Sequence, residues 1–428
     1  ANGRQAQCPV VSRLTVPTST HRRRLKEPRH GRTAPERSSA RPGVLSRLLD
    51  LIDWPALRSL VCRRAVANGL DAEQLDLVVR QVKEPGQLPR LLDRIARDLE
   101  NRARYWDDLG LRPRARDHYL NAALWGFYAQ LMLADAPEQR ARVYARCAES
   151  YRHAAPHLEH PAQPLDIPYQ AGALKGYLRI PYIEDTFPSG QTDAGSGTDR
   201  RSAAADACAF ALGGHPCVII LNSFASSKEE LHFTESALLN QGMATLSFDY
   251  PGVGENAAGH LESLSQEILG NALYLSLAAN PAVDAERVAL LGFGLGGALA
   301  LSLSVVFPER YRAVATLCAP YELPLRPMRR FVPSRLPLPL IELGSPEAIA
   351  ELSAGLSLHG RLDGLTAPLL VAGGGRDPYV RAEDTRRIYE EAASQDKKLL
   401  FCPRATHGLY EMMPSLRHEV AQWIKQRL

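Results

Sequence analysis

The sequence predicts an α/β protein with a mostly parallel sheet flanked by helices, and a helical domain before it. In the second half of the chain, short continuous apolar runs alternate with helical stretches, a pattern typical of strands buried on both faces. In the first half, apolar residues recur every three or four positions, as in amphipathic helices. The 428 residues, 45% of them hydrophobic and 23% charged, have the composition of an ordinary globular protein.

The first 43 residues differ from the rest of the chain. They contain ten Lys and Arg residues but only two acids, Glu27 and Glu36, so the remaining 41 basic and 45 acidic residues leave a slightly acidic body. A segment this polar cannot bury enough apolar surface to fold, and we expect 1–43 to be a disordered basic leader. A transit peptide and a basic interaction arm are the alternatives. The acidic body argues against a nucleic-acid-binding protein.

The seven cysteines are odd in number and widely scattered, and the sequence has no Cys-x-x-Cys pair and no Cys/His cluster with zinc spacing. This usage predicts free thiols in a reducing compartment. We therefore expect a cytoplasmic protein with no metal and no other cofactor.

Residues 44–160 predict a helical N-terminal domain of five or six helices. Its apolar periodicity is clearest in "VLSRLLDLIDWPALRSLVCRRAV", "LPRLLDRIARDLENRARYWDDLG" and "ARDHYLNAALWGFYAQLMLAD". Gly69, Gly110 and Pro137 punctuate the helices. The prolines of "APHLEHPAQPLDIPYQ" predict the end of the helices and a connector.

Residues 161–428 predict the α/β domain. It opens with "ALKGYLRIPYI", a strand or hairpin, and the polar, Gly/Ser-rich residues that follow predict a mobile insertion at 184–215. The buried strands of the sheet are expected at 217–222, 243–249, 287–293, 313–319, 367–374 and 397–403.

The uncharged stretch "VALLGFGLGGALALSLSVVF" at 288–307 allows three interpretations. A membrane span would need about 20 helical residues, and the glycines between Gly292 and Gly297 would interrupt it. A dinucleotide-binding Gly-x-Gly-x-x-Gly turn needs an acid at the end of the next strand, where this chain has Cys318, Ala319 and Pro320. The third interpretation is a Gly-x-Ser-x-Gly nucleophile elbow in which Gly294 stands in place of the serine.

The third interpretation has support elsewhere in the chain. An elbow needs small residues on both sides of the strained position, and Gly292, Gly296 and Gly297 meet that need. Enzymes with this turn order their triad as nucleophile, acid and histidine. Asp377 follows one predicted strand and His407 follows the next. The hydroxyl group is the one part that the sequence lacks.

With these residues in place, the chain resembles the α/β-hydrolase superfamily over about 100–428. More narrowly, it looks like the group that contains 2,6-dihydroxypseudooxynicotine hydrolase, the fungal heptaketide hydrolases and the fermentation–respiration switch proteins. The resemblance lies in "LRPRARDHYLNAALWGFYAQ" and "YARCAESYRHAAPHL" of the helical domain, in "NSFASSKEEL" as an oxyanion loop, and in the turn "SFDYPGVGE".

The resemblance implies Asp377 as the triad acid, His407 as the general base, and oxyanion donors at the backbone N–H of Leu295 and near Phe224. Some enzymes of the group cleave carbon–carbon bonds next to a ketone, and polyketide substrates occur among them. The chain departs from the pattern at Gly294, which replaces the nucleophile, and at Asn222–Ser223, which replace glycines of the oxyanion loop.

A His–Asp pair and an oxyanion hole do not need a serine to act on an activated ketone. We therefore expect an enzyme that acts on a small ketonic or polyketide-like substrate by C–C hydrolysis, elimination or cyclisation. The alternatives are a catalytically silent protein that binds a ligand or partner, and a Ser-to-Gly inactivated form of a serine hydrolase. The expected partner is a small-molecule substrate, with no nucleic acid and no membrane, and a homodimer is an open alternative to a monomer.

Four further residues have two interpretations each. Glu322 is either a second carboxylate of the pocket or a solvated loop acid, and Cys318 is either a buried small residue or a substitute nucleophile. Asp249 and Glu255 are expected to stabilise a turn, with catalysis as the alternative. The proline-rich segment 323–349 is expected to form a cap over the pocket.

Overall fold

The structure, a computed structural model, describes six segments of the chain: 54–133, 136–182, 213–223, 226–256, 264–323 and 346–428. The predicted leader, nearly all of the insertion at 184–215 and nearly all of the cap segment at 323–349 lie outside these segments.

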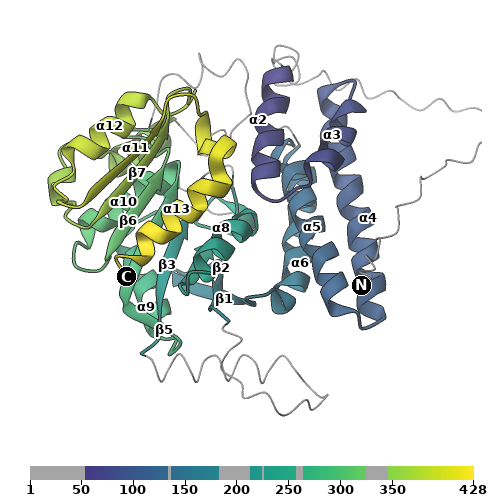
Figure 1. Ribbon diagram of the computed structural model, residues 1–428, viewed down its shortest axis with the longest axis horizontal. Coiled ribbons are helices and arrows are strands. Elements are labelled where there is room, and N and C mark those ends of the chain that lie inside the picture. Colours follow the sequence, from purple (N-terminus) through teal and green to yellow (C-terminus); the bar gives the residue numbers. More distant parts are fainter. Residues whose placement is uncertain (1–53, 134–135, 183–212, 224–225, 257–263, 324–345) are drawn as a thin grey trace, which may run out of the picture. The chain divides into compact units, whose positions relative to one another are not determined.

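Five α-helices are described before the first strand, as the apolar periodicity predicts (Figure 1): α2 (Trp54–Ala67), α3 (Ala72–Arg80), α4 (Leu88–Asp108), α5 (Arg112–Leu131) and α6 (Pro137–Ala154). Their apolar faces form one core that includes Leu92, Trp125 and Tyr151, each 1% exposed or less. Pro137 lies in the first turn of α6, where its missing N–H has no acceptor to lose.

An eight-stranded sheet follows, with the strand order β1-β2-β4-β3-β5-β6-β7-β8. All pairs from β4 to β8 are parallel, while β1 and β2 are antiparallel to their neighbours. The strands are β1 (Ala162–Tyr169), β2 (Gly172–Arg179), β3 (His215–Leu221), β4 (Ala244–Phe248), β5 (Val283–Phe293), β6 (Ala313–Leu317), β7 (Leu369–Gly374) and β8 (Lys397–Cys402). The predicted fold class is confirmed, and each of the six predicted strands is present, but β8 lies at the second edge of the sheet and is only half-buried.

The predicted connector at 155–170 is wrong in its second half, because Ala162–Tyr169 forms β1 and pairs with β2 along its whole length. The prolines misled the prediction. β1 is the edge strand of the sheet, and an edge strand tolerates proline where a central strand does not, since one row of its backbone N–H groups has no partner strand. Ile167 and Tyr169 are the buried residues that anchor it.

Helices cover both faces of the sheet (Figure 1). Along β3, Cys217 and Ile219 belong to the core on one face, while Val218 and Ile220 belong to the core on the other, as the two-sided burial of a parallel sheet requires. The first face is covered by α9 (Gln266–Ala278), α10 (Leu295–Val306), α11 (Pro346–Leu356) and α12 (Ala382–Glu391), and the second by α8 (His232–Leu239) and α13 (Met413–Lys425).

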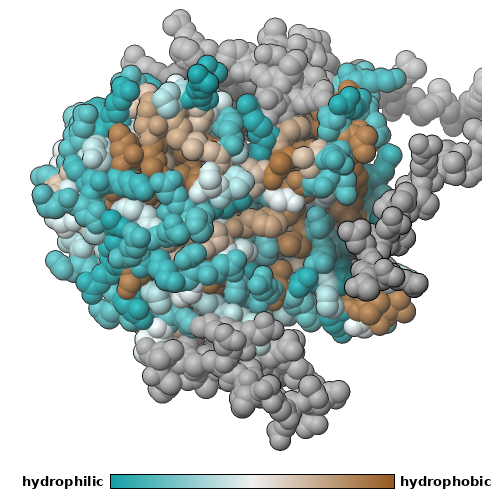
Figure 2. All heavy atoms as spheres, in the orientation of Figure 1, coloured by the Kyte–Doolittle hydropathy of each residue, from teal (hydrophilic) through white to brown (hydrophobic). Residues whose placement is uncertain are grey.

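The surface is mostly hydrophilic on the face shown in Figure 2, with hydrophobic residues in several patches. One patch, at the lower right, lies at the turn between α4 and α5, where Tyr105, Leu109 and Leu111 are exposed. Within the described segments, every helix is too short or too polar to cross a bilayer.

Candidate active site

Residues 288–307 form the end of β5, a one-residue turn and the helix α10. The turn residue is Gly294, with φ 54° and ψ −118°. Residues other than glycine adopt this backbone conformation only under strain. A strained residue between a strand and a helix lifts its side chain above the end of the sheet. This is the geometry of a nucleophile elbow, with glycine at its apex.

The small residues around the apex are required by close backbone contacts. A Cβ atom added to Gly296 would lie 2.1 Å from the carbonyl oxygen of Leu221 in β3, and one added to Gly292 would lie 2.3 Å from the carbonyl oxygen of Gly296. At Gly297 the Cβ would meet that of Ala319 at 2.7 Å. Glycine at these positions lets α10 start directly against the sheet.

His407 and Asp377, which are 30 positions apart in the sequence, are hydrogen-bonded. The Nδ1 atom of His407 lies 2.8 Å from Oδ2 of Asp377. The other carboxylate oxygen accepts the backbone N–H groups of Tyr379 at 2.8 Å and Val380 at 2.9 Å. Burial raises the pKa of Asp377, but His407 and these hydrogen bonds outweigh it, so the pKa is lowered below its ordinary value. The carboxylate therefore stays ionised at neutral pH and holds the proton of His407 on Nδ1.

The free nitrogen of the imidazole faces the elbow. A Cβ atom added to Gly294 would lie 3.8 Å from Nε2 of His407, so a hydroxyl group on that carbon would be within hydrogen-bonding reach of the ring. The ring of Tyr379 meets the imidazole edge to face, with centroids 5.0 Å apart. The predicted positions 294, 377 and 407 are thus brought together, and the imidazole is held by both Asp377 and Tyr379.

Cys318 lies at the end of β6, next to this pair. One ligand atom each of Cys318, Asp377 and His407 lie within 4.8 Å of one another, the only group of this kind in the described segments. Burial raises the pKa of the Cys318 thiol well above its ordinary value, and Asp377 raises it further. A metal ion would have to displace both the thiol proton and the proton between Nδ1 and Oδ2, so the geometry favours the hydrogen-bonded pair over a metal site.

A protonated thiol that is 1% exposed is a poor nucleophile. We expect Cys318→Ser to change turnover by less than about threefold, because buried structural thiols of this kind are inert. Alkylation of the native protein with iodoacetamide at pH 8, followed by peptide mass spectrometry, is expected to leave Cys318 unmodified and to label the half-buried Cys402. Rapid labelling of Cys318 together with loss of turnover in Cys318→Ser would make it the nucleophile instead.

Two backbone segments border the elbow on the side where an oxyanion would form. Leu295 is the first residue of α10, and the first N–H groups of a helix have no acceptor within the helix. The second segment is the loop after β3. Its Asn222 is fixed by Tyr250, whose hydroxyl donates to the Asn222 carbonyl at 2.5 Å. Phe224, the other predicted oxyanion residue, lies outside the described segments.

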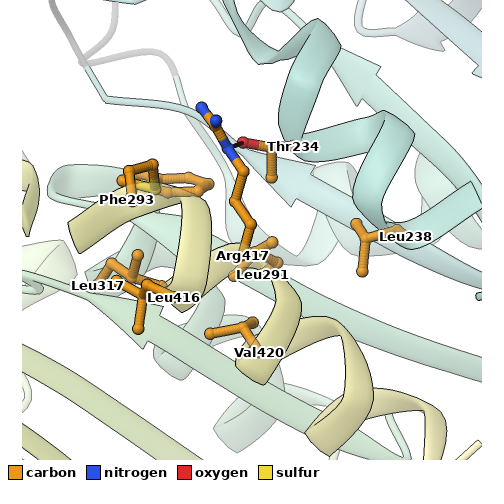
Figure 3. A pocket seen from close by; sticks show the side chains of 9 residues that line it. Thr234, Leu238, Leu291, Phe293, Leu317, Leu416, Arg417 and Val420 are labelled. Atoms are coloured by element: carbon orange, nitrogen blue, oxygen red, sulfur yellow. Dashed lines mark hydrogen bonds between the residues drawn. The ribbon is translucent and has the colours of Figure 1, made fainter. Parts of the chain in front are cut away.

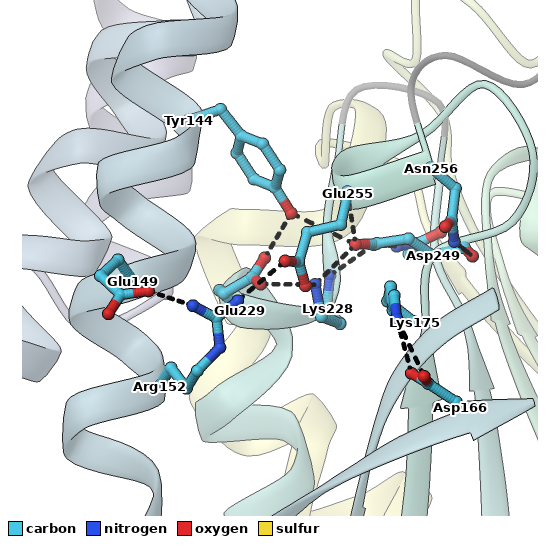
Figure 4. A network of polar contacts seen from close by, with 11 residues as sticks. Tyr144, Glu149, Arg152, Asp166, Lys175, Lys228, Glu229, Asp249, Glu255 and Asn256 are labelled. Carbon is cyan, nitrogen blue, oxygen red and sulfur yellow. Dashed lines mark hydrogen bonds and ion pairs between the residues drawn. The ribbon is translucent and has the colours of Figure 1, made fainter. Parts of the chain in front are cut away.

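A buried ionic network continues from this loop (Figure 4). The ammonium group of Lys228 lies 2.6 Å from Glu229, 2.9 Å from Asp249 and 2.7 Å from Glu255, and its side chain is 1% exposed. Tyr144 of α6 donates to Glu229 at 2.9 Å. Asp249 also accepts the backbone N–H of Lys228 at 2.9 Å. The network joins the helical domain, the loop after β3 and the turn after β4.

A second network connects the same loop to α2. Arg64 makes two hydrogen bonds with the carboxylate of Glu230, at 2.6 and 2.5 Å, and the hydroxyl of Tyr128 donates to the same group at 2.8 Å. On the other side of Glu230, the hydroxyl of Ser226 donates at 2.6 Å. The consecutive acids Glu229 and Glu230 therefore connect the loop to three helices, α6 through Glu229 and α2 and α5 through Glu230.

The remaining predicted residues have different places. Asp249 and Glu255 contact Lys228 in the network described above rather than the imidazole, as expected of turn-stabilising residues. Glu322 is exposed on the loop after β6. The segment that follows it is not described, so its role as a second carboxylate stays a prediction.

A separate small pocket lies between α8 and α13 (Figure 3). Its walls are apolar except for Thr234 and Arg417, which are hydrogen-bonded to each other at 3.1 Å. None of Gly294, Asp377 and His407 lines it. Residues of β5 and β6 line one side of the pocket, and none of the lining residues is an acid or a histidine.

The sequence analysis missed the groups that hold the site in place. Lys228, Glu229 and Glu230 form the 3₁₀ turn η4 (Lys228–Leu231). Three consecutive charged residues ordinarily indicate a solvated surface. Here all three side chains are buried, and their partners come from α2, α5, α6 and β4, which no local pattern could identify.

Comparison with known proteins gives a consistent result. Residues 211–327 match the model of the family described as esterase FrsA-like. The chain is 30% identical over 220 residues to the 2,6-dihydropseudooxynicotine hydrolase of Paenarthrobacter nicotinovorans, an alignment that covers 50% of each protein. It is 24% identical over 326 residues to esterase FrsA of Yersinia enterocolitica, covering 73% of this chain and 71% of that protein.

Among solved structures, the crystal structure of the 2,6-dihydroxy-pseudo-oxynicotine hydrolase superposes with a TM-score of 0.69 at 23% identity, and covers 86% of this chain and 95% of that one. The sequence alignment with the curated hydrolase spans only half of that protein's length. The structural superposition covers 95% of the hydrolase chain in the crystal structure. The chain therefore has the fold of the α/β-hydrolases, and residues 211–327 are similar to the FrsA-like esterases.

Proposed function

We propose that the chain is an enzyme that acts on a small ketonic or polyketide-like substrate, using the His407–Asp377 pair as a general base without a covalent intermediate. One observation carries the proposal: the imidazole is paired with its carboxylate at 2.8 Å and presents Nε2 to the apex of the elbow, 3.8 Å from the place of a Cβ atom. An imidazole whose Nδ1 is bonded to a carboxylate and whose Nε2 faces the reaction site is suited to general-base catalysis. The residue beneath it, Gly294, offers no hydroxyl group.

The chemistry follows from these groups. In C–C hydrolysis of a β-diketone, Nε2 takes a proton from water as the water oxygen bonds to a carbonyl carbon, and the N–H of Leu295 stabilises the resulting oxyanion. When the oxyanion collapses, the C–C bond breaks and its electrons leave as an enolate. The imidazolium returns its proton to the enolate, giving a carboxylic acid and a ketone. Elimination or cyclisation would use the same base to remove a proton next to the carbonyl.

Support for a hydrolytic reaction comes from the relatives. The curated relative that is 30% identical is named a hydrolase of a pseudooxynicotine, and the FrsA proteins are named esterases. Hydrolysis of an ester in these folds ordinarily begins at a serine on the elbow. Because residue 294 is glycine, an activated ketone attacked by water is the better match to this site.

The test is a panel of β-diketones and cyclic diketones incubated with the wild-type chain, with products identified by mass spectrometry. We expect consumption of at least one diketone and negligible turnover of p-nitrophenyl esters. If the panel is untouched, and diketones nevertheless bind in a titration, the silent ligand-binding alternative is favoured.

Restoring the hydroxyl group tests whether the elbow is aligned with the base. We expect Gly294→Ser to gain p-nitrophenyl acetate turnover with an acyl-enzyme burst, because its Oγ would be within hydrogen-bonding reach of Nε2. Gly294→Ala is the matched control, since it carries the same backbone strain without the hydroxyl. A burst in neither variant would mean that His407 does not serve the elbow. A burst in Gly294→Ser combined with a wild type that acts on nothing would favour the Ser-to-Gly inactivated form.

A further inference from the structure

Among the described residues other than its chain neighbours, Ser223 has the side chain nearest to the apex of the elbow. A Cβ atom on Gly294 would lie 2.8 Å from the Ser223 Oγ and 3.3 Å from its Cβ. The residue is half-buried, two positions beyond β3, and its carbonyl accepts the N–H of Ser226 at 3.1 Å, which closes the start of the oxyanion loop. A hydroxyl group is therefore present at the elbow, although it belongs to the loop after β3 and not to residue 294.

This hydroxyl and the imidazole border the same small space. The point that a Cβ of residue 294 would occupy is 2.8 Å from Ser223 Oγ and 3.8 Å from His407 Nε2. Within the described segments, neither atom has a hydrogen-bond partner, whereas Nδ1 of the same ring is bound to Asp377. The point itself is one bond length from the Gly294 Cα, so a water bound here must lie farther out, in van der Waals contact with that carbon and about 2.7–3.2 Å from both polar atoms.

We propose that Ser223 positions the attacking water over Gly294. The inference rests on the hydrolytic form of the proposed function. The water donates one hydrogen to Nε2 and the other to Oγ of Ser223, which leaves a lone pair directed at the substrate carbonyl. His407 then removes the first proton as the oxygen–carbon bond forms. Ser223 keeps its own proton throughout and forms no bond to the substrate.

A nucleophilic role for Ser223 fits the geometry less well. No hydrogen bond joins its hydroxyl to His407 in the described structure, although an activated serine requires one. Its backbone also belongs to the loop expected to supply an oxyanion donor, so its Oγ would approach the carbonyl from the side of the oxygen rather than across the face of the carbon. Glycine at 294 leaves empty the position that the side chain of a serine there would occupy, beside Ser223 Oγ and His407 Nε2.

The kinetic test compares Ser223→Ala, Ser223→Thr and Ser223→Gly with the wild type on a diketone that the wild type consumes. Loss of one hydrogen bond to the water is expected to lower kcat about tenfold in the alanine and glycine variants, with KM changed by less than about twofold. The threonine variant keeps the hydroxyl and is expected to stay within about threefold of the wild type. Thermal unfolding of each variant checks that the fold is intact.

These results separate the inference from the proposed function. If His407→Ala abolishes turnover while Ser223→Ala keeps the wild-type kcat, the inference fails and the proposed function stands. If His407→Ala has no effect, the proposed function itself fails. A covalent adduct on Ser223, found by peptide mass spectrometry after incubation with substrate, would overturn the positioning role in favour of a nucleophile.

A measurement that does not depend on turnover is available as well. In a high-resolution crystal structure of the wild type we expect an ordered water bonded to both Oγ of Ser223 and Nε2 of His407. In Ser223→Ala its occupancy is expected to fall to less than about half, because a site with one fewer partner holds water weakly. Full occupancy in the alanine variant, or no water in the wild type, would contradict the proposal.

Discussion

Replacing His407 by alanine is expected to lower kcat by about 10²–10⁴, the range that general-base catalysis provides. The physical reason is that Nε2 is the group that faces the elbow, at 3.8 Å from the place of a Cβ on Gly294. KM should change little, because the imidazole stabilises the transition state of proton transfer and does not bind the ketone in the ground state. The measurement is steady-state consumption of a diketone at pH 7.

Asp377→Asn should produce a loss of similar order, about 10²–10⁴. An amide group can donate to Nδ1, which would move the ring proton to Nε2 and remove the base. The wild-type carboxylate stays charged at neutral pH because its pKa is lowered by His407 and two backbone N–H groups. As a control, His153→Ala on α6, with a half-exposed side chain, should keep full activity. Activity that survives in both site variants would show that the pair is structural.

Replacing Lys228 by methionine is expected to have the largest effect on stability, about 3–5 kcal/mol in the free energy of unfolding. The ammonium group neutralises Glu229 and Asp249, which are fully buried, and the partly exposed Glu255. Methionine has a similar volume but leaves Glu229 and Asp249 without the ammonium group in a site that water does not reach, whereas Glu255 keeps its ion pair with Arg152. Urea unfolding at pH 7, followed by circular dichroism, measures the loss.

The surface pair of Lys175 and Asp166 provides the matched control (Figure 4), because both side chains are about half exposed. Lys175→Met should cost less than about 1 kcal/mol. The cost of Lys228→Met should also shrink from pH 7 to pH 5. Burial raises the pKa of Asp249, so without Lys228 the folded state takes up protons that the unfolded state does not, which stabilises the variant as the pH falls. Equal costs for the two lysines would show that the buried network carries no stability.

Most of the fold could be predicted from the sequence because its signals are local. Continuous apolar runs mark the parallel strands, and each predicted range overlaps one, although β3 and β5 begin before the predicted ranges. The exception is β1, where Pro164 and Pro168 hid a strand that lies at the edge of the sheet. Proline is informative about a central strand and much less so about an edge, and the sequence does not say which strand is at the edge.

The reactive part of the site was also predictable, since Gly294, Asp377 and His407 each follow a strand and the ends of parallel strands gather at one edge of a sheet. The supporting part was not. Ser223 is important because of its distance from Gly294, 71 positions away, and Lys228 because helix α6 and the turn after β4 enclose it. Such contacts depend on how distant segments pack, which no spacing in the sequence encodes.

The central claim is that a paired imidazole acts on a water molecule held over Gly294. A crystal structure with a trifluoromethyl β-diketone, which binds such sites as its hydrate, tests it most directly. We predict one oxygen of the hydrate between Nε2 of His407 and Oγ of Ser223, and the other at the backbone N–H of Leu295. A hydrate bound elsewhere, a covalent bond from the ligand to a side chain, or an imidazole turned away from Gly294 would contradict the claim.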